Sequence, residues 1–146
     1  MIAQINISTL KAPLDAPEIA DFKNNLDRIN QLAEQSQGFI WRLQDESGNA
    51  TGIQGTDNPL LVLNISVWQS FSDLHRFVFQ SAHKDIMMRR DTFFEPESKP
   101  IFALWHLPEN APMPSVDDAF QRLNHLREHG PSERAFGWYN YKKFIS

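Results

Sequence analysis

The sequence contains no cysteine, and this absence excludes disulfide bonds, thiolate catalysis and cysteine-ligated metal centres. It also has no apolar run of the roughly 18 residues that are needed to span a bilayer. Residues 1–6 lack the basic start and the long apolar stretch of a secretion signal. We therefore expect a cytoplasmic protein without a membrane partner, because a reducing compartment suits a chain without cysteine.

Positive charge is scarce as well, with 14 Lys and Arg against 18 Asp and Glu and a net charge of −4 at pH 7. An acidic chain does not attract a phosphate backbone, so nucleic acid is not expected as a partner. The signature motifs of nucleotide-binding loops, zinc proteases and serine hydrolases are missing. Only His125 and His129 have the close spacing of a shared metal site, and a supporting acidic ligand would have to come from elsewhere, so no metal is predicted.

The most informative stretch is an apolar run followed by a capped amphipathic helix. Residues 60–68 are Leu, Val, Ile and Trp apart from Asn64 and Ser66, which is typical of a strand with both faces covered. Ser70 precedes Asp73 by three residues, the spacing of an N-cap and its acidic partner. Apolar residues then recur at helical spacing, at Phe71, Leu74, Val78 and Ala82.

Further strands are predicted at residues 2–10, 39–44 and 101–107 from alternating or apolar patterns. Asp15, Pro17 and Glu18 predict the start of a helix that ends at Gly38, and Ser115 caps another that ends at Gly130. Glycine and asparagine predict a mobile loop over residues 45–58, and the aromatic residues 135–144 predict a last short strand or an extended tail.

This order of elements predicts an α+β, ferredoxin-like fold with an additional C-terminal helix and tail, in one domain over residues 1–146. A single sheet with helices on one face leaves its other face bare, and here that face still carries large apolar residues. Two such sheets packed face to face form a dimeric α+β barrel. We therefore expect a homodimer, because a symmetric pair is the commonest way to bury such a surface.

Two short motifs resemble the dimeric α+β barrel superfamily, which includes antibiotic-biosynthesis and haem-degrading monooxygenases. They are Val67-Trp68-x-Ser70 and the run from Phe79 to Lys84, which reads FQSAHK. The whole chain, with His129-Gly130-Pro131 and the aromatic tail, is more similar to a bacterial family of this superfamily that is described only as a domain of unknown function. The resemblance implies the barrel fold and a monooxygenase-like chemistry without naming a substrate.

The haem-degrading members use an asparagine on the first strand, a histidine on the second helix and a tryptophan near that histidine. Asn6 matches the first by position and His83 matches the second by its Ala-His-Lys setting. The tryptophan is not matched, because Trp68 corresponds to a different, strand-end tryptophan. The resemblance therefore implies Asn6 and His83 as catalytic candidates and favours no cofactor, with haem bound at His83 as the alternative.

The residues themselves leave two interpretations open at each candidate. An imidazole at His83 can act as a base or iron ligand near pH 7, or it can bond to backbone at a helix end. Asn6, Asn64 and Ser66 lie on strands expected to be buried, so each needs a partner that is either structural or a ligand.

Aromatic and basic side chains are open to the same two interpretations. Trp68 and Trp105 either line an aromatic pocket or belong to the core or the dimer interface. Arg42, Arg89 and Arg90 either bind a carboxylate or stay solvated. Two functions remain: a small-molecule enzyme resembling the cofactor-independent monooxygenases, with its pocket between sheet and helices, and a non-catalytic dimer that binds a small apolar or aromatic ligand. Convergent polar groups in the pocket favour the first, and a purely hydrocarbon pocket favours the second.

Overall fold

The computed structural model describes residues 1–44, 60–80 and 89–144. The predicted mobile loop over residues 45–58 and the candidate His83 lie outside the described residues. The strands are β1 (Ile2–Thr9), β2 (Phe39–Arg42), β3 (Leu61–Trp68) and β4 (Phe102–His106). The helices are α1 (Ala20–Gln35), α2 (Phe71–Gln80), α4 (Arg90–Phe93), α5 (Val116–His129) and α6 (Tyr141–Phe144), and a 3-10 turn (Pro17–Ile19) precedes α1.

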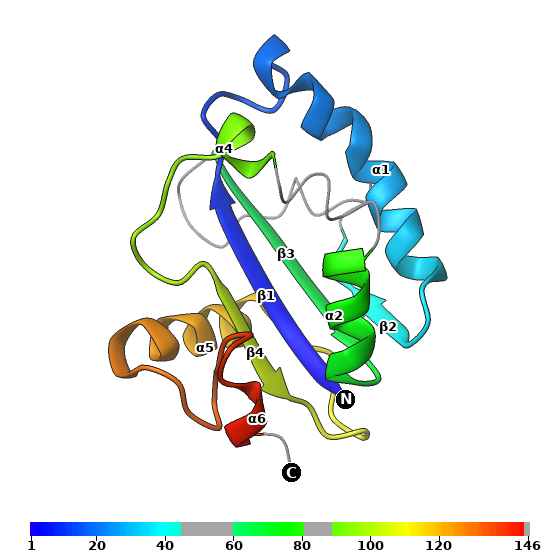
Figure 1. The fold of residues 1–146 in the computed structure, drawn as a ribbon, viewed down its shortest axis with the longest axis vertical. Coiled ribbons are helices and arrows are strands. Elements are labelled where there is room, and N and C mark those ends of the chain that lie inside the picture. The colour runs from blue at the N-terminus through cyan, green and yellow to red at the C-terminus, as the bar shows by residue number, and fades with distance from the viewer. Residues whose placement is uncertain (45–59, 81–88, 145–146) are drawn as a thin grey trace.

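The four strands form one antiparallel sheet in the order β2-β3-β1-β4. The central strand β1 pairs along its whole length with β3, from Ile2 opposite Trp68 to Thr9 opposite Leu61. This arrangement, with helices connecting and covering the strands (Figure 1), confirms the predicted α+β class. In the part of the chain that the structure describes, no helix has the length and apolar character to cross a membrane.

The two faces of the sheet are covered by different helices (Figure 1). Helix α5 packs on one face, where Ala3, Ile5 and Val67 meet Leu123 in a core whose members are almost fully buried. Helix α2 packs on the other face, where Leu74 and Val78 join a second cluster. The face that sequence analysis left bare is therefore covered over β1 and β4 by a helix of the same chain.

Local structure corrects three details of the sequence prediction. A register irregularity between Phe39 and Trp41 places Phe39 with the α2 cluster and Trp41 with the α5 cluster, although strict alternation would put them on one face. The first helix begins as a 3-10 turn after Ala16, which provides no side-chain cap, so Asp15 is not its capping residue. The aromatic tail forms isolated bridges from Phe136 to Leu104 and from Ala135 to Ser132 instead of a strand, and it ends in the short helix α6.

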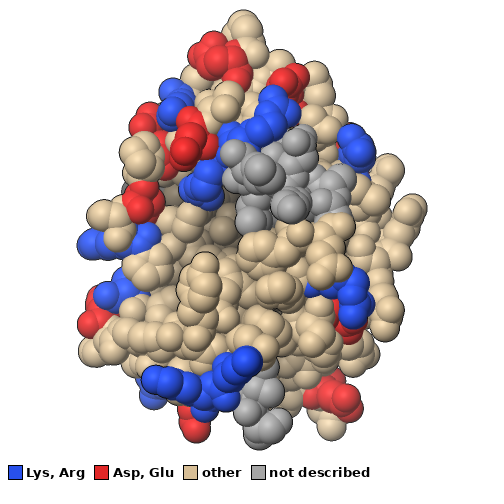
Figure 2. Space-filling model, viewed as in Figure 1, with Lys and Arg blue, Asp and Glu red and all other residues tan. Residues whose placement is uncertain are grey.

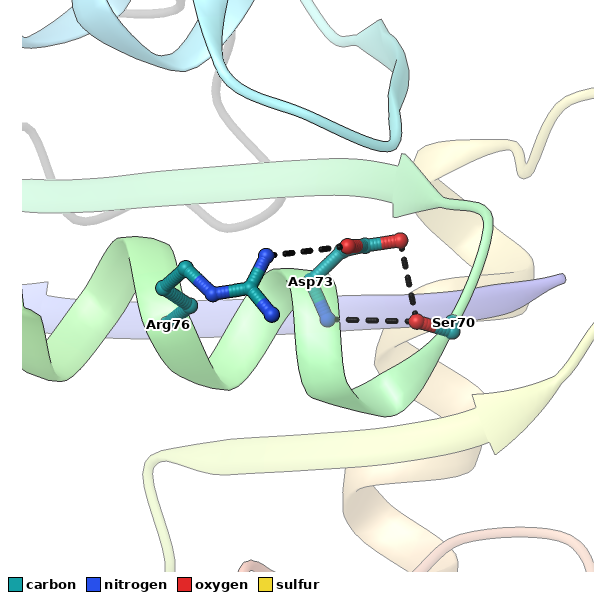
Figure 3. Close-up of polar contacts among 3 residues, drawn as sticks. All are labelled: Ser70, Asp73 and Arg76. Atoms are coloured by element: carbon teal, nitrogen blue, oxygen red, sulfur yellow. Dashed lines mark hydrogen bonds and ion pairs between the residues drawn. The ribbon is translucent and has the colours of Figure 1, made fainter.

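The cap of α2 matches its prediction and gives a direct test of the fold. Ser70 Oγ accepts the backbone N–H of Asp73 at 3.2 Å and donates to Asp73 Oδ2 at 2.9 Å, while Arg76 pairs with Oδ1 (Figure 3). We expect Ser70→Ala to lower the free energy of unfolding by about 1 kcal/mol, because the N–H loses its acceptor. Urea denaturation measures this loss. Ser72→Ala is the control on the same exposed turn, and equal midpoints for the two variants would contradict the role of the cap.

Candidate functional site

A row of polar side chains runs along the α2 face of the two central strands. Because strand residues alternate between faces, Gln4, Asn6 and Ser8 of β1 point to the same side. The register places Gln4 opposite Ser66 and Asn6 opposite Asn64, so these side chains form one patch across β1 and β3. Sheet residues beneath helices are ordinarily apolar and belong to the core. Here the polar patch interrupts the apolar core on this face of the sheet.

This polar patch is the floor of a cavity of about 400 Å³ between the sheet and the helices. That volume falls in the usual range of small-molecule sites, which is on the order of 300–1,000 Å³. The opposite walls are largely apolar and aromatic and come from α1, α2, α4 and the tail; they include Phe22, Leu26, Ile29, Leu74, Phe77, Val78, Phe94 and Trp138. On the face shown in Figure 2, the charged side chains of the described residues lie mostly in the upper part and near the margins, and the lower middle is largely uncharged.

The hydrogen bonds on the floor orient its groups as donors. Gln4 Nε2 donates to Ser66 Oγ at 2.7 Å and also to Asn64 Oδ1, and Trp68 Nε1 donates to the same Ser66 Oγ at 3.0 Å. Ser66 Oγ therefore accepts two N–H groups and keeps its own O–H to donate. The Nδ2 group of Asn64 and the amide of Asn6 have no partner among the described residues. The floor therefore presents several uncharged hydrogen-bond donors to a ligand.

Two arginines line the cavity, and they differ in the partners of their guanidinium groups. Arg42 is buried, and its Nε lies 2.8 Å from Glu34 Oε1, so a carboxylate of the same chain balances its charge. Arg90 begins α4, contacts Ser8 Oγ at 3.5 Å and lies with its guanidinium 5.4 Å from the centre of the Phe94 ring. Across the described lining residues there is no carboxylate and no imidazole. The cavity is therefore suited to neutral or anionic ligands.

The C-terminal tail forms one end wall of the cavity. Trp138 lines it and stacks on Phe102, with ring centres 4.5 Å apart and planes 15° from parallel. Tyr141 of α6 stacks on Phe71 of α2 at 3.6 Å, which anchors the tail against the helix. A segment near the end of the sequence is thus part of a site whose floor comes from its first strand.

The structure brings together five of the residues selected from sequence: Asn6, Arg42, Asn64, Ser66 and Trp68 all line the cavity. Asn64 is exposed and Asn6 half-buried, so only Ser66 of the three polar strand residues is buried as expected. Asn6 and Asn64 face a cavity, whereas sequence analysis expected them to be packed in the core.

Trp105 does not belong to this site, which corrects the prediction. It lies on the α5 face, fully buried, with the Arg122 guanidinium 5.2 Å from its ring centre. Its Nε1 has no hydrogen-bond partner among the described residues. The reason is alternation along β4, which points Phe102 toward the cavity and Trp105 toward α5.

Gln4, Ser8 and Trp138 also line the cavity but were missed by sequence reasoning, whereas Arg90, which was considered as a carboxylate-binding residue beside Arg42, lines it too. Gln4 and Ser8 carried a usable signal, because they continue the alternating polar pattern of Asn6 on a strand that has covered neighbours on both sides. Trp138 carried none, since it lies far from that strand in the sequence. Across the described residues, no three His, Cys, Asp or Glu side chains are grouped closely enough to hold a metal ion.

Comparison with known proteins places the chain in a family. The sequence matches the family described as a domain of unknown function, DUF3291, over residues 1–144. The chain belongs to this family. No match was found among curated protein sequences. The DUF3291 match covers the strands, the helices and the tail that line the cavity, so the whole site lies within the family domain.

Among solved structures, the DUF3291 chain is similar to SnoaB, a cofactor-independent oxygenase from Streptomyces nogalater. The match covers 76% of this chain and 96% of SnoaB at 17% sequence identity, with a TM-score of 0.48. A SnoaB variant in which an asparagine is replaced by alanine matches with the same coverage and identity and a TM-score of 0.50. At this identity the likeness shows a monooxygenase-like α+β fold and nothing about the reaction.

Proposed function

We propose that the protein is a cofactor-independent monooxygenase that oxidises small organic molecules in the cavity between the sheet and helices α1 and α2. The observation that carries this proposal is the convergence of uncharged polar groups on the floor of an otherwise apolar cavity. Asn6 presents its amide and Asn64 its Nδ2 group to this cavity without a partner among the described residues, and a simple hydrocarbon binder would have no use for them. The fold shared with SnoaB, described as a cofactor-independent oxygenase, supports the same reaction class. We place the enzyme in the cytoplasm as a single domain.

The proposed chemistry requires a substrate that ionises to an enolate or phenolate. Asn64 and Ser66 would donate to its oxyanion, and preorganised donors of this kind stabilise developing negative charge. Such an anion can pass electrons to O2 by itself. One oxygen atom then replaces two hydrogens at the substrate carbon to form a carbonyl, and the other leaves as water. His83 and Asn6 remain the candidates for removing the substrate proton and orienting oxygen.

The experiment is oxygen uptake by the purified protein with a panel of ionisable cyclic ketones and phenols, such as tetralone and indandione. Oxygen consumption above the uncatalysed rate, together with transfer of labelled oxygen into the product, is the expected result. Binding of the same compounds without any oxygen consumption would instead favour the alternative, a non-catalytic dimer that binds a small apolar or aromatic ligand.

We also propose that the protein works as a homodimer. Helix α5 contacts β1 and β4, whereas Ile40, Trp41 and Leu61 on the β2–β3 half of the same face are only partly buried. A second copy placed there would complete the burial of these apolar side chains. Sedimentation equilibrium at micromolar concentration should give twice the chain mass of 16.9 kDa. A monomer mass under these conditions would contradict the proposal.

A further inference from the structure

We propose that the substrates of this cavity are organic acids and that Arg90 binds their carboxylate. This inference rests on the proposed function only in using the same cavity, and it adds the chemical class of the ligand. The carboxylate would lie at the Arg90 and Ser8 end of the polar row, with the apolar body of the ligand beneath the helices.

Of the arginines Arg42, Arg89 and Arg90, only Arg90 lacks an ion pair with a carboxylate of the described residues. Arg42 is paired with Glu34 at 2.8 Å, and Arg89 is paired with Asp21 at 2.7 Å. Arg90 has no carboxylate within ion-pairing distance among the described residues, although it is half-buried in the cavity wall. Its positive charge is therefore left for a ligand.

The surroundings of Arg90 fix its orientation without using its donors. The Phe94 ring supports the guanidinium as a cation–π contact, and Ser8 Oγ provides one long hydrogen bond at 3.5 Å. A guanidinium has five N–H donors in a planar fork that matches the two oxygens of a carboxylate. An arginine held in this way is prepared for a bidentate anion.

Two acidic residues near Arg90 line a hollow beside the main cavity. Glu95 and Glu97 line a neighbouring hollow that Arg90 also borders, together with Arg127. The main cavity has no carboxylate among its described lining residues. In the neighbouring hollow Glu95 and Glu97 balance the charges of Arg90 and Arg127, whereas in the main cavity no described carboxylate competes for Arg90, so an anion should bind Arg90 from the cavity side.

The spacing of the floor sets the size of the ligand. Asn6 and Ser8 are two residues apart on β1, which separates them by roughly 7 Å along the strand, and Asn64 lies opposite Asn6. A ligand whose acid group meets Arg90 and Ser8 and whose second oxygen meets Asn64 needs polar ends about that far apart. The length of a fused two-ring aromatic acid fits this requirement.

The test compares a hydroxynaphthoate, whose hydroxyl lies on the ring remote from the acid group, with its neutral amide by calorimetric titration of the full chain without any turnover. We expect the acid to bind more tightly than the amide. Arg90→Gln should weaken acid binding by about tenfold to a hundredfold and leave the amide unaffected, because a charge-assisted bidentate contact is lost. Arg76→Gln is the matched control, since it removes the same charge from an exposed position on α2 outside the cavity.

Arg90→Lys is a second variant that keeps the charge and loses the fork, and it should retain the preference for acid over amide. Equal affinity of wild-type protein for acid and amide, absence of binding by both, or equal effects of Arg90→Gln and Arg76→Gln would overturn the proposal. Because these measurements need no oxygen, the two proposals fail separately. Preference for the acid without oxygen uptake would contradict the oxygenase proposal alone. Oxygen uptake without preference for the acid would contradict the organic-acid proposal alone.

Discussion

Replacing Gly38 with alanine is expected to lower the free energy of unfolding by about 2–5 kcal/mol, from left-handed strain and a steric clash together. Gly38 has φ of 85°, a conformation that side chains with a Cβ disfavour. A Cβ at this position would also lie among the side-chain atoms of Asp73, whose Cγ would be only 2.3 Å away. Asp73 has little freedom to move aside, because Ser70 and Arg76 hold it in the cap of α2.

The chain offers two matched controls for this substitution. Gly130 also has a positive φ, 77°, but nothing lies within 4 Å of its added Cβ, so Gly130→Ala measures the backbone strain alone. Gly137→Ala has only an ordinary contact, at 3.5 Å from Asn140 Oδ1. Urea denaturation should rank the losses Gly38, Gly130, Gly137. If Gly38→Ala cost no more than Gly130→Ala, the close approach of β2 to the start of α2 would be wrong.

Replacing Asn64 with alanine is expected to lower kcat/KM of the proposed oxygenase reaction by about 10²- to 10³-fold, the usual loss when one donor to an oxyanion is removed. Stability should change little, because Asn64 is exposed and Gln4 keeps its bond to Ser66. Asn64→Asp should lower kcat/KM at least as much, since it replaces the donor N–H group by a carboxylate oxygen in a side chain of nearly the same size. Initial rates of oxygen uptake, measured beside denaturation midpoints, separate the two effects.

Asn24→Ala serves as the control for Asn64, because Asn24 is an exposed asparagine on α1 that does not line the cavity. It should leave the rate unchanged. Normal turnover by both Asn64 variants would exclude the amide as an oxyanion donor and would leave Ser66 and Asn6 as the polar groups to test next.

Local chemistry explains what could be predicted about the fold. The Ser70 cap was predictable because it involves atoms within one helical turn, where three residues of spacing determine the geometry. The polar row was partly predictable for a similar reason, since alternation alone places Gln4, Asn6 and Ser8 on one face of a strand. In each case the residues concerned are close neighbours in the sequence.

The sequence by itself therefore determined the four strands, the helices α1, α2 and α5, the polar face of β1 and the cap of α2, because these depend on short-range periodicity. Tertiary structure alone decided which side chains share the cavity. The irregularity at Phe39 and Trp41 sent their rings to opposite faces, and α5 covered Trp105 on the side away from the cavity. Packing of α4 and the tail brought Arg90 and Trp138 to a floor made by β1 and β3. These contacts join residues far apart in the sequence, and no local pattern encodes which distant elements will meet.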